Sequence, residues 1–317
     1  VHIAAPFPIG DIMSEKNTFP FSSRTPLRIT FGIALVILIV FAFVPAIAVF
    51  FVSFTDLRGV TYLPTKFIGL QNYIQYFGLG HRADNLNALK NTLIFASLST
   101  IIQITLALGI AILLNNPRLR GRNIYRAVVF MPTVLGVTVT ALVWSLMFNT
   151  SGGPIQQVLL LFGKNSAFFG DQNIALYLVI FVQIWMVCGT SVIIFLSGLQ
   201  AIPQELYEVS SIDGAGPWAQ FRFVTLPMLS PSVTANVLLG IVNALQSYQL
   251  TYVLTGADKK GTQVLSLQVY MQAFGGRSGT TLSQSQGYAA AISMVQFVLV
   301  GVITLATLAY LRRREQK

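Results

Sequence analysis

The chain has 317 residues, of which 54% are hydrophobic and only 9% are charged, and its mean hydropathy is +0.68. This composition excludes an ordinary water-soluble domain and predicts an all-α membrane protein, because each bilayer-spanning helix needs about 20 apolar residues. The net charge of +10 could indicate a nucleic-acid partner, but the basic residues are not interleaved with aromatic residues on a polar face, so membrane orientation explains them better.

The N-terminal residues 1–28 are polar, contain several prolines and show no helical period, so we expect a flexible cytoplasmic tail. Met13 resembles a translation start, and we interpret residues 1–12 as a leader or an added segment. The first apolar stretch, residues 29–54, is longer than the core of a signal peptide and lacks a small-residue cleavage signal. We therefore predict a membrane anchor that is retained.

Five further apolar stretches complete a prediction of six membrane spans. They cover approximately residues 91–114, 127–148, 174–199, 228–254 and 288–311. Aromatic residues near residues 67–74 predict a short helix at the level of the lipid headgroups. The transmembrane domain is thus expected to cover residues 29–311 and to be followed by a basic cytoplasmic tail at residues 312–317.

The distribution of Lys and Arg predicts the orientation. If the N-terminus is cytoplasmic, 12 of the 20 basic residues lie in inner segments, mostly close to the ends of spans. The outer loops spread the other basic residues over longer stretches. By the positive-inside rule, both termini are expected to be cytoplasmic.

The polar stretch at residues 203–227 lies between the fourth and fifth predicted spans and is expected on the cytoplasmic side. A proline at its start suits the first helical turn, while Glu205 and Glu208 favour the N-terminal end through the helix dipole. Gly214 supplies a stop signal. We predict a short surface helix over residues 203–213, then a bend and a second short turn.

Groups that could power or catalyse a reaction are missing from the predicted spans. Every Asp, Glu, His, Lys and Arg lies outside them, which argues against a proton-coupled carrier but leaves sodium coupling open. The sequence has no complete phosphate loop, catalytic triad or metal-binding cluster, so we expect no enzymatic activity, cofactor or metal in this chain. Uphill transport would need energy from another chain.

The segment from Glu205 to Ala215, with Leu226-Pro227 downstream, resembles the EAA loop of bacterial ABC importer permeases. More closely, the chain resembles the carbohydrate-uptake permeases of the maltose and glycerol-phosphate type. The other matching segments are residues 67–73, Asn91-Thr92, Arg126 with residues 130–132, Trp144, residues 196–203, residues 252–256 and residues 270–274. The chain departs from the motif at Val209 and Ser210, where the family has alanines, and at residues 257–260, where the family often has glycine and proline.

The resemblance implies the type I ABC importer permease fold, with six transmembrane helices and a cytoplasmic coupling helix that docks on an ATPase subunit. It further implies a second homologous permease, an ATPase dimer that binds ATP and Mg, an extracytoplasmic solute-binding protein, a sugar or oligosaccharide substrate, and a place in the bacterial inner membrane. The coupling residues would be Glu205, Leu206, Glu208, Val209, Ile212, Asp213, Gly214 and Ala215. An ordinary amphipathic connector would show the same three-residue apolar spacing.

The candidate substrate residues lie mainly on the fifth predicted span. If that helix is continuous, its small and polar residues share one face, which comprises Asn236, Gly240, Asn243, Ser247 and Thr251. Asn243 and Gln246 carry amides that can donate to and accept from a hydroxyl-rich ligand. Helix packing is the alternative use of such residues in membranes. The full candidate set is Asn243, Gln246, Ser247, Tyr248, Tyr252, Trp144 and Asn149, with Gln183 and Trp185 as weaker candidates.

Three other functions remain consistent with the sequence. The first is a secondary carrier or facilitator that works without an ATPase, and the second is an ABC permease for a solute other than a sugar. The third is a structural or assembly subunit. Transport by the chain alone would favour the first, and transport that is insensitive to Asn243 and Gln246 would favour the third.

Overall fold

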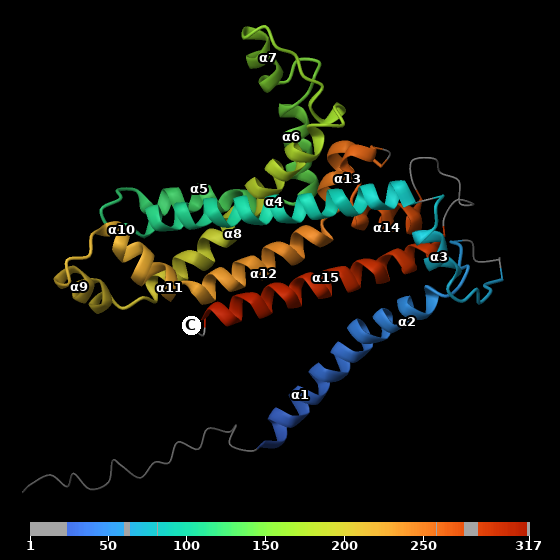
Figure 1. Cartoon of the computed structure of the whole chain (residues 1–317), viewed down its shortest axis with the longest axis horizontal. Helices are drawn as coiled ribbons and strands as arrows, with labels where there is room; N and C mark the ends of the chain where they lie inside the picture. The colour runs from blue at the N-terminus through green and yellow to red at the C-terminus, as the bar shows by residue number, and fades with distance from the viewer. Residues whose placement is uncertain (1–23, 60–63, 81, 258, 276–284, 316–317) are drawn as a thin grey trace, which may run out of the picture. The chain divides into compact units, whose positions relative to one another are not determined.

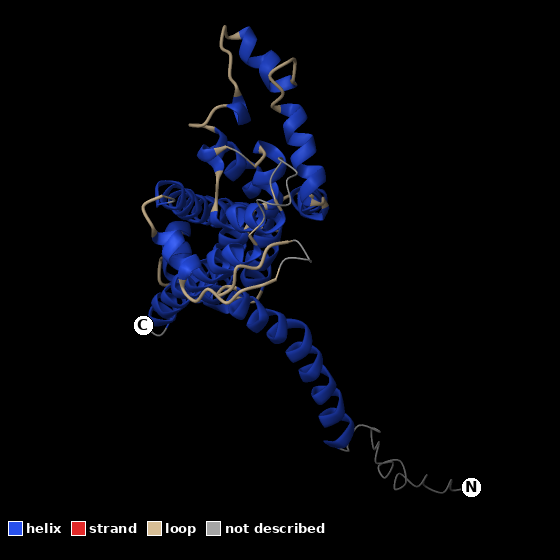
Figure 2. Cartoon of the chain, turned by 90° about the vertical axis from the view of Figure 1, so that its right-hand side faces the viewer, coloured by secondary structure: helices blue, strands red, loops and turns tan. Residues whose placement is uncertain are grey.

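The structure is a computed structural model. It describes residues 24–59, 64–80, 82–257, 259–275 and 285–315. Helices make up the regular structure of these ranges (Figure 2), and the β-structure in them is limited to an isolated bridge between Thr55 and Phe67. The predicted all-helical fold is therefore confirmed. The chain divides into residues 1–51 and residues 52–317, and each unit is described by itself.

The first unit contains a continuous helical rod formed by α1 (Arg24–Leu38), the π-helical turn η1 (Ile39–Phe43) and α2 (Val44–Val52). Its apolar part is long enough to span a membrane, as predicted. The wide turn precedes Pro45, which has no N–H and whose ring would clash with the carbonyl four residues earlier in a regular α-helix.

This rod begins five residues before the predicted start at residue 29. Residues 24–28, which we assigned to the flexible tail, are helical instead. Pro26 does not prevent this, because proline is tolerated in the first turn of a helix, where its missing N–H would have no partner. The rest of the predicted tail, including the proposed leader, lies outside the described residues.

The second unit is built around four long helices, α4 (Arg82–Asn115), α8 (Ala175–Gln200), α12 (Ser230–Gln246) and α15 (Gln286–Glu315). Figure 1 shows α4, α12 and α15 running beside one another, and α8 packs on α4 along most of its length. Including the rod, four helices of the described ranges are long and apolar enough to span a membrane, or six if each of two bent pairs is one span.

The first bent pair corrects the third predicted span. Instead of one helix over residues 127–148, α5 (Arg122–Val134) and α6 (Val137–Met147) meet at 101°. Pro132 weakens the last turn of α5, and Leu135 and Gly136 then adopt extended backbone angles.

The second bent pair consists of residues 217–228 and Ser230–Gln246, which meet at 65°. The fifth predicted span, residues 228–254, also needs a correction at its other end. The helix α12 ends at Gln246, Ser247 is extended, and α13 (Gln249–Thr255) starts afresh. The predicted helix face therefore stops at Asn243. Two of its other members serve packing: Gly240 lies against Thr100 of α4, and Thr251 is completely buried.

Shorter elements connect the long helices. They are α3 (Gln71–Phe77), α7 (Pro154–Leu161), η2 (Phe168–Gly170), α9 (Gln204–Ile212), α10 (Pro217–Gln220), η3 (Phe221–Thr225), α11 (Leu226–Met228), η4 (Lys260–Thr262) and α14 (Leu265–Phe274). The predicted headgroup-level helix corresponds to α3, and the predicted surface helix and second turn correspond to α9 and to α10 with η3.

Close helix contacts depend on small residues, as is common where helices associate in lipid. A Cβ atom on Gly189 of α8 would lie 2.6 Å from the carbonyl oxygen of Val129 and 2.8 Å from Cγ2 of Thr133, both on α5. Between α8 and α4, Nε2 of Gln103 donates to Oγ of Ser191 at 2.7 Å, which satisfies two buried polar groups. These contacts fix α4, α5 and α8 as one packed group.

Candidate functional site

The surface helix α9 ends in a well-defined C-terminal cap. Gly214 adopts φ +79°, a left-handed conformation that favours glycine. Its N–H donates to the carbonyl of Ser211 at 3.1 Å, and the N–H of Ala215 donates to the carbonyl of Ser210 at 2.9 Å. This pair of bonds is the Schellman motif, so the helix stop predicted at Gly214 is confirmed.

The outer face of α9 is both apolar and acidic. Leu206, Val209 and Ile212 are 39%, 57% and 85% exposed. Glu205 and Glu208 are also exposed, and neither carboxylate has a hydrogen-bond or ion-pair partner in the described part of the chain. A helix with three exposed apolar side chains and free carboxylates is a candidate docking surface for another protein.

The inner face of α9 is fastened to the segment that leads into α12. The hydroxyl groups of Tyr207 and Thr225 are 3.0 Å apart. Nε2 of Gln220 donates to the carbonyl of Tyr207 at 3.3 Å and to the hydroxyl of Ser211 at 2.8 Å. The Tyr207 ring also packs on the buried cluster that includes Phe195 and Leu199 of α8.

These contacts join α9 to the membrane helices through side chains as well as through the backbone. The predicted site residues did not include Tyr207, Gln220 or Thr225. The sequence indicates these residues only through their positions. Tyr207 lies on the helix face opposite Glu205, and the other two lie in the second short turn.

A polar pocket of about 390 Å³ lies at the break between α12 and α13. It brings together four of the seven predicted substrate residues, Asn243, Gln246, Ser247 and Tyr248. Asn243 and Gln246 are exposed, and their amides make no side-chain hydrogen bond within the described ranges. The other lining residues are Val137, Gln183, Met186, Val187, Gln249 and Leu250.

Both corrected helix breaks contribute to this pocket. The bend after Pro132 places Val137, the first residue of α6, in the lining, and the break at Ser247 opens the lining of α12. Gln183 of α8, a weaker candidate, is 95% buried and accepts a long hydrogen bond of 3.5 Å from the hydroxyl of Ser247. Gln249 was missed, because a continuous helix would have directed it away from Asn243.

Aromatic residues extend from one side of the pocket. The ring of Tyr248 stacks on Tyr270 of α14 at a centroid distance of 5.0 Å, and Tyr252 contacts the same ring edge-on at 5.3 Å. Tyr252 therefore does not line the pocket but supports Tyr248 through Tyr270.

Two predicted substrate residues lie away from the pocket. Trp144 belongs to an aromatic cluster with Phe148, Phe181 and Trp185, at centroid distances of 5.6, 5.0 and 5.5 Å. Asn149 accepts a hydrogen bond from the backbone N–H of Ser151 at 2.8 Å and shapes the turn after α6. The structure thus gives Trp144 a packing environment and Asn149 a role in a turn.

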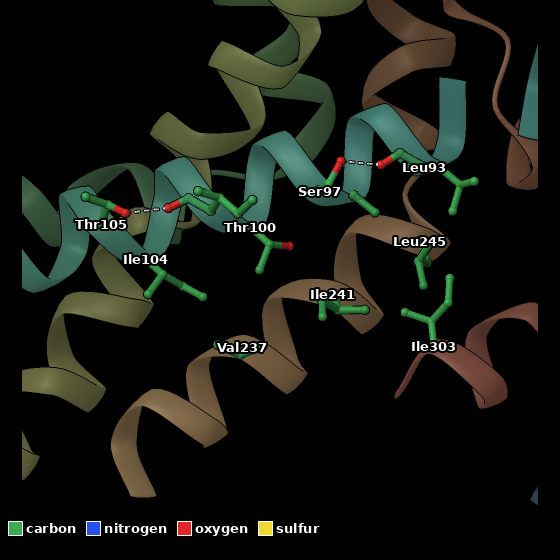
Figure 3. Close-up of a pocket in the computed structure, with 11 residues that line it drawn as sticks. Leu93, Ser97, Thr100, Ile104, Thr105, Val237, Ile241, Leu245 and Ile303 are labelled. Carbon is green, nitrogen blue, oxygen red and sulfur yellow. Dashed lines mark hydrogen bonds between the residues drawn. The ribbon is translucent and has the colours of Figure 1, made fainter. Parts of the chain in front are cut away.

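A second cavity, of about 420 Å³, lies between α4, α12 and α15 and is lined mainly by aliphatic side chains such as Leu93, Val237 and Ile303 (Figure 3). The hydroxyls of Ser97 and Thr105 donate to carbonyls of their own helix. This cavity offers a polar solute few partners, so it is a poorer candidate for a substrate site than the polar pocket.

The segment after α13 is held against α4. Nδ2 of Asn91 donates to the carbonyls of Lys260, Gly261 and Gln263 at 3.1–3.2 Å. The hydroxyl of Thr92 accepts from the N–H of Leu265 at 2.9 Å. This contact gives the Asn91-Thr92 motif a structural role. Residue 258, within the divergent tract at residues 257–260, lies outside the described residues.

Long apolar helices, a polar pocket where one of them breaks and an exposed helix tied to the same span define a multi-span transport protein. The family model for the "binding-protein-dependent transport system inner membrane component" matches residues 103–316. The chain belongs to this family, the membrane-spanning permease subunits of ATP-driven importers.

Curated relatives agree with this membership. The chain is 32% identical over 277 residues to the trehalose/maltose transport system permease protein MalF of Thermococcus litoralis, covering 86% of this chain and 89% of the relative. It is 30% identical over 290 residues to the lactose transport system permease protein LacF of Rhizobium radiobacter, covering 90% and 92%. The arabinooligosaccharides transport system permease protein AraP of Bacillus subtilis is 28% identical over 303 residues, covering 94% and 90%.

Solved structures show the same fold. A chain of a bacterial ABC transporter involved in the import of the acidic polysaccharide alginate superposes with a TM-score of 0.77 at 20% identity, covering 92% of this chain and 96% of that chain. A chain of the bacterial alginate ABC transporter in complex with an alginate pentasaccharide-bound periplasmic protein gives 0.74 at 19% identity, covering 93% and 96%. The predicted type I importer permease fold is confirmed.

Proposed function

We propose that this chain carries a neutral sugar or oligosaccharide across the cytoplasmic membrane by alternating access. The observation that supports this most directly is the polar pocket at the α12–α13 break, where the amides of Asn243 and Gln246 have no side-chain hydrogen bond to any described residue. Free amides in such a pocket can exchange hydrogen bonds with sugar hydroxyls as both donors and acceptors.

Two further properties of the pocket favour a neutral sugar. None of its lining residues is charged, so a charged solute would lose its hydration without gaining an ionic partner there. Tyr248 offers an aromatic face beside the amides, a common surface for sugar rings. The names of relatives include trehalose, maltose, lactose and arabinooligosaccharides, which supports this substrate class.

The coupling surface supports an external source of energy. We propose that α9 docks in a cleft of an ATPase subunit, with Leu206, Val209 and Ile212 in the contact and Glu205 and Glu208 facing the partner. Asp213, Gly214 and Ala215 close the helix. Closure of the ATPases would then move α9, and its bonds to Thr225 and Gln220 would transmit that movement toward α12.

The proposed assembly contains a second homologous permease, an ATPase dimer that binds ATP and Mg, and an extracytoplasmic solute-binding protein. In this arrangement the chain itself binds no cofactor and catalyses no reaction. Both termini and α9 face the cytoplasm, because that topology places most basic residues on the inner side.

Reconstitution in liposomes tests this function. Uptake of radiolabelled maltose and trehalose should require the ATPase subunits, ATP inside the liposome and the solute-binding protein outside. Uptake by this chain alone would instead identify a secondary carrier or facilitator. The substrate proposal would be overturned if the complete importer transported a charged or non-sugar solute in place of a neutral sugar or oligosaccharide.

Loss of either free amide is expected to weaken substrate binding. Asn243→Ala and Gln246→Ala should each raise the KM for uptake about tenfold, because each removes hydrogen bonds to the sugar. The matched control is Ser145→Ala, since this exposed hydroxyl bonds only to a carbonyl of its own helix. Kinetics of uptake at several sugar concentrations provide the measurement, and unchanged KM values in both variants would remove the pocket from the substrate path.

A further inference from the structure

The helix break at the pocket leaves backbone carbonyl groups of α12 without their helical hydrogen-bond partners. Because α12 stops at Gln246, the carbonyl groups of its last turn lose the N–H partners that a continuing helix would provide. The Ser247 N–H bonds to the carbonyl of Ala244 at 3.3 Å. The next carbonyl, that of Leu245, belongs to a residue that is 99% buried, so water cannot satisfy it.

Two side chains from other helices satisfy this carbonyl. Oγ of Ser266, in the first turn of α14, donates to the Leu245 oxygen at 2.9 Å. Nε2 of Gln296, on α15, donates to the same oxygen at 3.0 Å and to Oγ of Ser266 at 2.7 Å. Three helices thus meet in one closed hydrogen-bond network at the break.

The position of Gln296 within an apolar helix needs a physical explanation. Gln296 is the eleventh residue of a 30-residue apolar helix, about 15 Å along its axis from the first residue. A glutamine at that depth needs partners, because an unpaired amide in an apolar environment is unfavourable. Its partner here is a carbonyl one residue from Gln246 and two residues from Asn243.

We infer that Gln296, together with Ser266, is a positioning element for the substrate pocket: it fixes the broken end of α12 and so the placement of Asn243 and Gln246. The inference rests on the proposed function for its link to sugar binding. Its structural part, that the network holds the α12–α13 break, stands independently. Gln296 does not line the pocket, so it acts through the backbone of Leu245.

Amide hydrogen exchange on the assembled importer tests the structural part without any sugar. Gln296→Met keeps a flexible side chain of similar length but cannot donate, and Ser266 remains on the carbonyl. We expect exchange in the peptide covering residues 245–252 to accelerate about fivefold in this variant. With Ser266→Ala added, the carbonyl has no donor and the acceleration should reach the order of a hundredfold.

Exchange is also measured in Ser266→Ala alone, where Gln296 still satisfies the carbonyl. The acceleration in the double variant should therefore exceed the product of the accelerations in the two single variants. The control is Ser293→Ala, one turn earlier on α15, whose hydroxyl bonds only to Ala290 of its own helix at 2.8 Å. Multiplicative effects, or faster exchange spread evenly over α4 and α8, would overturn the inference, because the network would not then be a local clamp.

Uptake kinetics test the link to substrate. With radiolabelled maltose and trehalose as probes, Gln296→Met should raise KM about fivefold while the maximal rate changes less than about twofold. A fall in maximal rate with unchanged KM would contradict a positioning role. If the unmodified importer transports a charged or non-sugar solute in place of neutral sugars, the proposed function fails, while the exchange experiment still decides whether the network holds the break.

Discussion

Gly214→Pro is expected to abolish coupling while leaving the protein inserted in the membrane. Proline fixes φ near −65°, whereas the native residue has φ +79°, and it removes the N–H that bonds to the carbonyl of Ser211. The change would cost about 3 kcal/mol at the end of α9. This cost corresponds to a population of the native cap that is about a hundredfold smaller.

Because Gly214 is exposed and has open space around it, the damage should stay local to α9. Substrate-stimulated ATP hydrolysis by the reconstituted importer should fall to the unstimulated level, and sugar uptake should be lost. Gly214→Ala, which costs about 1–2 kcal/mol in the left-handed conformation, should give an intermediate defect.

Gly216→Ala is the matched control for this series. Gly216 is also exposed, with no neighbour within 4 Å of an added Cβ, but its φ of −71° suits any residue. It should therefore retain normal stimulation. Full stimulation in Gly214→Pro would show that the cap of α9 is not part of the coupling surface.

The boundaries of α9 could be predicted because local signals agree there. Proline before the first turn, glutamate within it and glycine after the last turn all act within a few residues of the helix. The same holds for α8, whose observed bounds differ from the predicted span by one residue at each end. Long apolar sequences with clear ends need no tertiary information.

Hydropathy could not place the two helix breaks. Apolar residues continue through the first, and the polar residues 246–249 at the second are equally consistent with a polar face of one continuous helix. Pro132 and Gly136 were a usable signal for the bend between α5 and α6, although proline in a membrane helix often causes only a kink. At Ser247 and Tyr248 the sequence offers neither glycine nor proline. The break there depends on donors more distant in sequence, Ser266 and Gln296, which satisfy the carbonyl of Leu245.

The same dependence on tertiary packing explains why some candidate substrate residues were predicted correctly and others were not. Asn243 and Gln246 were found because free amides in an apolar stretch are conspicuous, and their place at the pocket needs only α12. Trp144 was chosen for a chemical property, ring stacking, which packing against Phe181 and Trp185 uses equally well. Side-chain type alone does not distinguish a ring that binds sugar from one that fills a core.

Substitution of Gly189 is expected to destabilise the packing of α5 against α8. An alanine Cβ would come within 2.6 Å of the carbonyl oxygen of Val129, and this backbone atom cannot move without shifting α5. Overpacking of this kind costs about 1–3 kcal/mol. The apparent Tm of the purified importer should fall by on the order of 5 °C in Gly189→Ala.

Gly189→Leu should prevent accumulation of folded protein in the membrane, because a branched side chain cannot fit where a single carbon already clashes. The control is Gly109→Ala on α4, where an added Cβ meets nothing within 4 Å and helix propensity improves. Thermal unfolding and membrane expression of the three variants provide the measurement. Equal stability of Gly189→Ala and Gly109→Ala would contradict the close approach of α5 and α8. It would also contradict the position of Val137 in the pocket, because the packing of α5 determines where α6 begins.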